Sequence, residues 1–167
     1  MAETSELMKR PTKSDCIVKR RAIEMFMPKV KSYLGHDWSE SEAPHIEKQI
    51  MEVLDEFSDG YSMARELERK GWEEDRGLVD LMDNGEACLC KAHEEIQGQW
   101  IKCYGIDPKR KIGDRVVTDI YERKGQVGEI SKFYLDSGQY GVRYPDQPET
   151  SCYLVEYEDV KDAPEAP

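Results

Sequence analysis

The sequence predicts an α+β protein in which a helical bundle precedes a small antiparallel β-domain. In the first two thirds of the chain, apolar residues recur at intervals of three and four, as in helices that bury one face. After Gly113 the interval becomes two, which is the alternation of strands with one buried face. The 167 residues are 38% hydrophobic and 9% aromatic, so the chain has enough apolar side chains for a folded core.

These patterns divide the chain into four segments. Residues 1–13 are polar and contain Pro11, which predicts a flexible head. Residues 14–106 should form the helical bundle and residues 110–160 the β-domain. The acidic, proline-containing residues 161–167 are expected to be a disordered tail.

The first two helices are predicted from N-cap residues and from proline. Ser14 or Asp15 should begin the first helix, and Pro28 should end or kink it. The second helix should begin near Pro44 and end at Asp59-Gly60. Its expected apolar stripe consists of Ile46, Ile50, Val53, Leu54 and Phe57.

Two short helices are expected at about 61–70 and 75–83, and a last, longer helix at about 86–104. Gly71 followed by Trp72 is typical of a helix end in which glycine is left-handed and the next residue makes a hydrophobic contact. Asn84-Gly85 should separate the last two helices.

Four strands are predicted at 115–121, 126–135, 139–144 and 151–157, followed by a 3₁₀ turn at 158–160. Asp136-Ser-Gly138 predicts a hairpin turn. Residues 112–160 resemble an SH3-like small β-barrel of the KOW or Tudor kind. The segments that carry this resemblance are Gly113-Asp-Arg-Val116, Gly125-Gln-Val-Gly-Glu-Ile130, Tyr140-Gly-Val-Arg-Tyr144 and Leu154-Val-Glu-Tyr-Glu-Asp-Val160.

The resemblance implies a fold and a binding role, because such barrels bind peptides, nucleic acid or other domains. In general style, the whole chain also resembles the small accessory proteins carried by phages and other mobile elements.

Charge is distributed unevenly along the chain, whose formal net charge is −11. Ser32–Tyr104 carries seven Lys/Arg against eighteen Asp/Glu, whereas Met1–Lys31 carries eight against four. A surface this acidic should repel nucleic-acid phosphates and attract a basic protein or a protein–nucleic-acid complex. The acidic candidates for that contact are Glu73, Glu74, Asp75, Asp80, Asp83, Glu94 and Glu95. The alternative interpretation of these residues is a solvated helix face.

A second hypothesis is direct nucleic-acid binding by the β-domain. Basic residues gather before and within its first strands, and aromatic residues nearby could stack on bases. The residues concerned are Lys109, Arg110, Lys111, Arg115, Tyr121, Arg123, Phe133 and Tyr134. Ordinary solubilising charge is the competing explanation.

A zinc- or thiol-dependent enzyme is a third hypothesis, carried by Cys88, Cys90, His93 and Cys103. Thiolate and imidazole ligands suit zinc, but Cys88 and Cys90 point to different faces of one helix. No nucleophile elbow or phosphate-binding glycine loop is present, so we expect a non-enzymatic protein without cofactors. Met1–Arg10 lacks the apolar core of an export signal, and no apolar run is long enough to span a membrane, so we expect a cytoplasmic protein.

Overall fold

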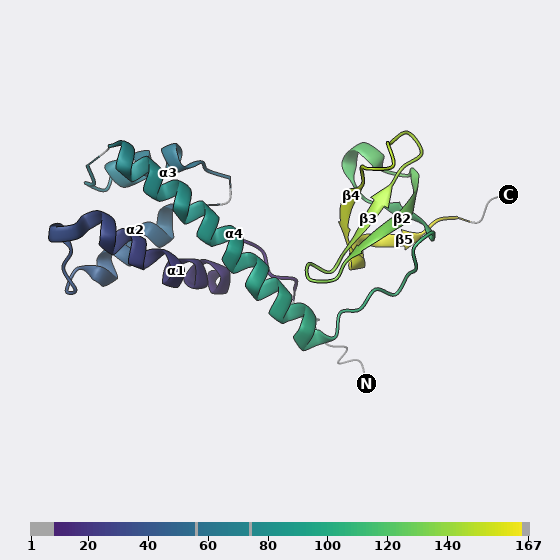
Figure 1. Cartoon of the computed structure of the whole chain (residues 1–167), viewed down its shortest axis with the longest axis horizontal. Coiled ribbons are helices and arrows are strands. Elements are labelled where there is room, and N and C mark those ends of the chain that lie inside the picture. Colours follow the sequence, from purple (N-terminus) through teal and green to yellow (C-terminus); the bar gives the residue numbers. More distant parts are fainter. Residues whose placement is uncertain (1–8, 56, 74, 165–167) are drawn as a thin grey trace. The chain divides into compact units, whose positions relative to one another are not determined.

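The computed structural model describes residues 9–55, 57–73 and 75–164 and has the α+β order expected from the sequence (Figure 1). Within these ranges, four α-helices occupy the N-terminal part, and a five-stranded antiparallel sheet follows them. Contacts divide the chain into a helical unit, Met1–Gln97, and a sheet unit, Gly98–Pro167. This division falls inside the last helix, whereas the predicted one falls in the segment after residue 106.

Helix α1 spans Cys16–Leu34 and continues through Pro28, so of the two expected effects of this proline, an end or a kink, the end does not occur. Its buried stripe continues beyond the proline to Val30, and packing of that stripe offsets the missing N–H. The helix ends at Gly35, and a 3₁₀ turn, Gly35–Asp37, follows it.

The chain ahead of α1 packs on the helical unit as far as the structure describes it. Arg10 and Pro11 are buried, and the Pro11 carbonyl oxygen lies 3.0 Å from Nε2 of His93. This part of the predicted flexible head therefore has a fixed position, while residues 1–8 lie outside the described residues.

Helix α2 spans Ala43–Val53 and is shorter than expected. Ile46, Ile50 and Val53 are buried as predicted, and Leu54 directly after the helix is buried too. Phe57, expected to extend the same stripe, is instead 88% exposed in the loop that follows.

Helix α3 spans Gly60–Glu68 and begins where the sequence predicts a stop. The Asp59 carboxylate accepts a hydrogen bond of 2.7 Å from the Ser62 backbone N–H, which makes Asp59 an N-cap. At the other end Gly71 has a φ of 97°, and the Trp72 N–H donates to the Leu67 carbonyl at 3.2 Å. The predicted glycine-terminated helix end is therefore confirmed.

Helix α4 spans Arg76–Tyr104 without the predicted interruption at Asn84-Gly85. A Cβ at position 85 would lie 3.3 Å from the Phe26 ring and 3.4 Å from Leu54. Gly85 thus allows α4 to approach α1, and the gain in packing outweighs the low helix propensity of glycine. The start of α3 also approaches α4 closely: a Cβ at Gly60 would collide with the Asp83 carboxylate and would lie 2.8 Å from the Asp83 backbone nitrogen.

One core of buried side chains holds the helical unit together and draws on all four helices. The core residues with the lowest exposure include Val18, Phe26, Ile50, Leu54, Met63, Leu67, Leu78, Met82 and Leu89.

No helix of the described residues is long and apolar enough to cross a membrane.

The strands of the sheet unit pair in the order β4-β3-β2-β1-β5. All four predicted strands are present with shorter bounds, and the hairpin turn at residues 136–138 joins β2 to β3. Ladders join only neighbours in this order among the described residues, so the sheet is open between β4 and β5. The strands are β1 (Arg115–Thr118), β2 (Val127–Tyr134), β3 (Gln139–Arg143), β4 (Tyr153–Glu156) and β5 (Val160–Asp162), with 3₁₀ turns at Tyr121–Arg123 and Tyr157–Asp159.

Strand β5 includes two residues that were expected to belong to a disordered tail. Val160 is buried in the sheet core, and the register Thr118↔Val160 and Val117↔Lys161 places β5 against β1. Because Val160 is buried, the polar residues Lys161 and Asp162 that follow it are also held in the strand, paired with β1. Residues 165–167 of the predicted tail lie outside the described residues.

Candidate protein-binding surface

The predicted acidic residues are divided by the structure into carboxylates engaged within the helical unit and carboxylates that remain available. Asp75 and Glu95 belong to the first group. The Asp75 carboxylate accepts from the Leu78 backbone N–H at 2.7 Å and from the Tyr33 hydroxyl at 3.1 Å. Glu95 forms an ion pair of 3.0 Å with Arg21.

The hydrogen bond from Tyr33 shows that the Asp75 carboxylate is part of the packed helical unit. Partial burial, together with the hydrogen bond to Asp75, raises the pKa of Tyr33 to about 12. Asp75 therefore acts as a helix cap and as a phenol partner, which limits its role on a binding surface.

Glu73 and Glu94 are exposed and make no ion pair with the described residues. Asp80 lies 4.0 Å from Arg76, a pair exposed enough to contribute little. Glu94 lies about three turns along α4 from Asp83, so the predicted residues do not form one continuous patch. Glu74 lies outside the described residues.

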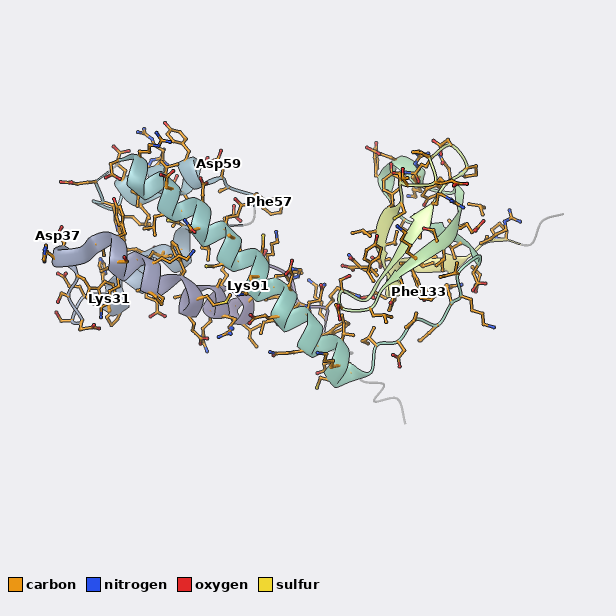
Figure 2. All side chains as sticks on the ribbon, in the orientation of Figure 1. Lys31, Asp37, Phe57, Asp59, Lys91 and Phe133 are labelled. Carbon is orange, nitrogen blue, oxygen red and sulfur yellow. The ribbon has the colours of Figure 1, made fainter. Side chains whose placement is uncertain are left out.

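A more compact acidic surface lies at the loop between α2 and α3, and of its residues the sequence predicted only Asp83. Phe57 and Asp59 lie on this loop (Figure 2). Tyr61 is 56% exposed in the first turn of α3. The Asp83 carboxylate of α4 accepts from the Gly60 backbone N–H at 3.1 Å, which brings α4 to the same place. We call Asp55, Phe57, Asp59, Tyr61 and Asp83 the Phe57 surface.

Each carboxylate of the Phe57 surface is held in position by a local hydrogen bond. Asp55 accepts from the Ser58 hydroxyl at 3.1 Å, Asp59 from Ser62, and Asp83 from Gly60. The hydrogen bonds from the Ser62 side chain and backbone lower the pKa of Asp59. Within the described ranges no Lys or Arg forms an ion pair with these three residues, so their negative charges are not neutralised locally.

The neighbouring helix α3 provides a contrast. Its carboxylates Glu66 and Glu68 form ion pairs with Arg69 and Arg65 of the same stretch. Negative charge at that surface is therefore largely balanced, whereas it is unbalanced at the Phe57 surface.

In the sheet unit, two of the predicted basic residues are occupied by contacts that stabilise the fold. Arg110 pairs with Asp162 and donates to the Val160 carbonyl at 3.1 Å, which ties the start of the unit to β5. Arg123 lies over the rings of Tyr144 and Tyr153, at 5.1 and 5.5 Å, and bonds Asp146 at 2.8 Å. Lys109, Lys111 and Arg115 are exposed.

The predicted aromatic residues of the sheet unit are not brought together. Tyr121 is 94% exposed in the turn after β1, whereas Phe133 and Tyr134 lie at the far end of β2, beside the hairpin. Phe133 also packs against Tyr140, with ring centroids 5.9 Å apart. The arrangement gives no continuous stacking platform for bases.

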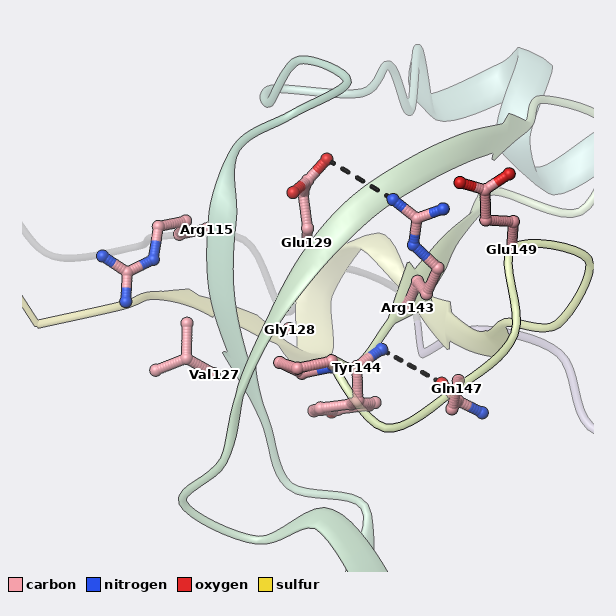
Figure 3. Close-up of a pocket in the computed structure, with 9 residues that line it drawn as sticks. Arg115, Val127, Gly128, Glu129, Arg143, Tyr144, Gln147 and Glu149 are labelled. Carbon is pink, nitrogen blue, oxygen red and sulfur yellow. Dashed lines mark hydrogen bonds and ion pairs between the residues drawn. The ribbon is translucent and has the colours of Figure 1, made fainter.

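A shallow groove of about 480 Å³ lies between β2 and the loop after β3 (Figure 3). Arg115 and Arg143 contribute positive charge to it, and Glu129 and Glu149 contribute negative charge. In the view of Figure 3 the Arg143 guanidinium lies between the two carboxylates. The groove therefore favours neither anions nor cations.

The cysteine–histidine set is dispersed. Cys88 is buried, and burial raises the pKa of its thiol, whereas Cys103 is exposed. His93 lies against the Pro11 carbonyl, and Cys90 is half-buried. The described residues contain no group of three or more His, Cys, Asp or Glu side chains placed to hold a metal ion.

No protein-family model matches the chain, and comparisons with curated proteins and with solved structures give no match either.

Proposed function

We propose that the chain is a non-enzymatic binding protein whose helical unit contacts a basic protein, alone or in a complex with nucleic acid. The observation that carries this proposal is the excess of exposed carboxylates in that unit, several of which have no ion-pair partner among the described residues. In its concrete form, the protein inhibits a nucleic-acid-handling host complex by occupying a surface that would otherwise bind phosphates, as an anti-defence or DNA-mimic protein would.

Electrostatics support a fast and selective encounter with such a partner. Unbalanced charge over a surface steers an oppositely charged protein and repels nucleic acid. Because these carboxylates are exposed, the attraction should weaken as the salt concentration rises.

We also infer that the sheet unit is an SH3-like barrel of the KOW or Tudor kind. Its five short strands, the 3₁₀ turn before the last strand and the pairing of that strand with the first all support this assignment. In that role the sheet unit adds a second contact to the partner.

The proposal is tested by affinity capture from the native host's lysate, with and without nuclease, followed by mass spectrometry. We expect a basic protein to be recovered in stoichiometric amount after nuclease treatment. Recovery should fall for the triple variant Glu73→Gln/Asp80→Asn/Glu94→Gln, which removes exposed negative charge.

The matched control is Glu24→Gln/Glu66→Gln/Glu68→Gln, which changes the net charge equally at carboxylates already paired with Arg21, Arg69 and Arg65. We expect this control to retain capture. Equal losses in the two variants would show that only overall charge matters, and recovery that disappears with nuclease would contradict the proposal.

A second candidate, a nucleic-acid-associated regulator, is favoured by the exposure of Lys109, Lys111 and Arg115 at the start of the sheet unit. It predicts DNA or RNA binding that weakens steeply with salt and is lost in Lys109→Ala/Lys111→Ala. Arg110 is unsuitable for this test because its substitution would also disturb β5. Strong binding of the isolated protein to nucleic acid would favour this candidate over the first.

A further inference from the structure

We propose that Phe57 is an aromatic anchor, inserted into an apolar pocket that is flanked by Lys or Arg residues on a basic partner protein. This inference rests on the proposed function and names the place and the chemistry of the contact. The apolar part is Phe57, supported by Tyr61, and the charged part consists of Asp55, Asp59 and Asp83.

The exposure of Phe57 is the first argument. The chain has three Phe residues; Phe26 is fully buried and Phe133 is half-buried, whereas Phe57 is 88% exposed. A partner that covers this ring gains the transfer free energy of a large apolar side chain, enough for at least a tenfold increase in affinity. Aromatic residues, Phe among them, are enriched in protein interfaces relative to the rest of the surface.

The second argument is that both ends of the loop are anchored. Leu54, at its start, is fully buried, and at its end Asp59 caps α3 while Gly60 donates to Asp83. Anchored ends restrict the positions that Phe57 can take, so less conformational entropy is lost when a partner binds.

The third argument identifies the occupant by its charge. Asp55 and Asp59 lie on the same loop as Phe57, and Asp83 lies against the end of that loop at Gly60; each carboxylate is oriented by a hydrogen bond, and none forms an ion pair with the described residues. An apolar pocket flanked by Lys or Arg residues would bury the Phe57 ring and would also form ion pairs with the carboxylates. A second copy of the chain does not, because a twofold contact through Phe57 would bring six carboxylates of like charge together.

The test compares two fluorescently labelled peptides that carry the same number of lysines. One is oligolysine, and in the other the lysines alternate with leucines. Their affinities are measured by fluorescence anisotropy at low salt for the wild-type chain and for three variants.

Phe57→Ser should weaken binding of the leucine-containing peptide about tenfold and leave oligolysine binding unchanged. Asp55→Asn/Asp59→Asn/Asp83→Asn should weaken both, because asparagine oxygens can still accept the three local hydrogen bonds while the charges are lost. Leu135→Ser, a change at an exposed apolar residue of the sheet unit that belongs to none of the candidate binding sets, should affect neither peptide.

The outcomes separate this inference from the function on which it rests. If both peptides bind but Phe57→Ser changes neither affinity, the anchor is wrong and the proposed function survives. If neither peptide binds the wild-type chain, the proposed function fails too. A wild-type dimer in sedimentation analysis that Phe57→Ser converts to monomer would overturn the anchor and assign the surface to a second copy.

Discussion

At the scale of single residues, Asp59 has two functions in one carboxylate. It caps α3 through the Ser62 N–H, and it contributes one of the negative charges of the Phe57 surface. The two functions can be separated because asparagine is as good an N-cap as aspartate but carries no charge.

We therefore expect Asp59→Ala to lower the urea midpoint of the helical unit and Asp59→Asn to lower it much less. The contribution of the ionised Asp59 carboxylate to the stability of the helical unit also depends on pH. Because the pKa of Asp59 is lowered in the folded state, its stabilisation is fully present above the unfolded value of about 3.8 and is lost as pH falls through the folded value.

Urea unfolding of wild type and Asp59→Asn between neutral and strongly acidic pH measures this effect. The stability difference between the two proteins should shrink in the acid range, since the other titrating groups are common to both. A difference that stays constant with pH would show that the Asp59 charge does not stabilise the helix end.

Neighbouring residues in the sequence were enough to predict some helix ends correctly, but not others. Gly71-Trp72 was predicted correctly because a left-handed glycine and the residue after it define a helix end by themselves. The helix expected at about 61–70 is present as α3, Gly60–Glu68, but the preceding helix ends at Val53 and does not reach Asp59-Gly60. Phe57 fits a helical period that the chain has already left after Val53.

At the scale of secondary-structure elements, β5 depends on a residue far from it in the sequence. Arg110 bonds the Val160 carbonyl and pairs with Asp162, which holds the last strand against β1. Arg110→Ala should destabilise the sheet unit by about 1.5 kcal/mol, the usual net contribution of a hydrogen bond from a charged group.

Hydrogen exchange of residues 160–162 and urea unfolding measure the effect of Arg110→Ala. Lys109→Ala is the control, because Lys109 is the exposed neighbour of Arg110. Equal protection of these amides in both variants would mean that backbone pairing with β1 is sufficient to hold β5.

The two elements predicted least well, α4 and β5, are decided by contacts distant in sequence. Asn84-Gly85 has the composition of a helix stop, yet the Phe26 ring of α1 packs at that position and α4 continues. Residues 161–162 have the composition of a tail, yet β1 offers them a strand edge. Neither neighbour is visible in a local window of sequence.

At the scale of the whole molecule, the two units have separate hydrophobic cores. We expect each to respond to its own mutations. Gly85→Val, which forces a branched side chain against Phe26, should destabilise the helical unit by about 1–3 kcal/mol. Arg110→Ala should affect only the sheet unit.

Urea titration followed by NMR resolves the two units through their own amide signals. Ala87→Val, at an exposed position of the same helix, is the control for Gly85→Val. Identical shifts of both sets of signals in every variant would contradict the separation and indicate one cooperative body.

The order of helices and strands could be predicted because periodicity and turn residues act locally. The proposed binding surface could be predicted only as a general excess of acidic residues. Which carboxylates are free depends on partners such as Tyr33 and Arg21, and these are set by tertiary packing.

The contact between Gly60 and Asp83 has an evolutionary consequence. A side chain at position 60 would collide with the Asp83 carboxylate, and its Cβ would also lie 2.8 Å from the Asp83 backbone nitrogen. A smaller residue at 83 would relieve the first collision but not the second. Homologues that keep this helix junction should therefore keep glycine at 60 whatever residue stands at 83, and sequences gathered from related genomes would show it.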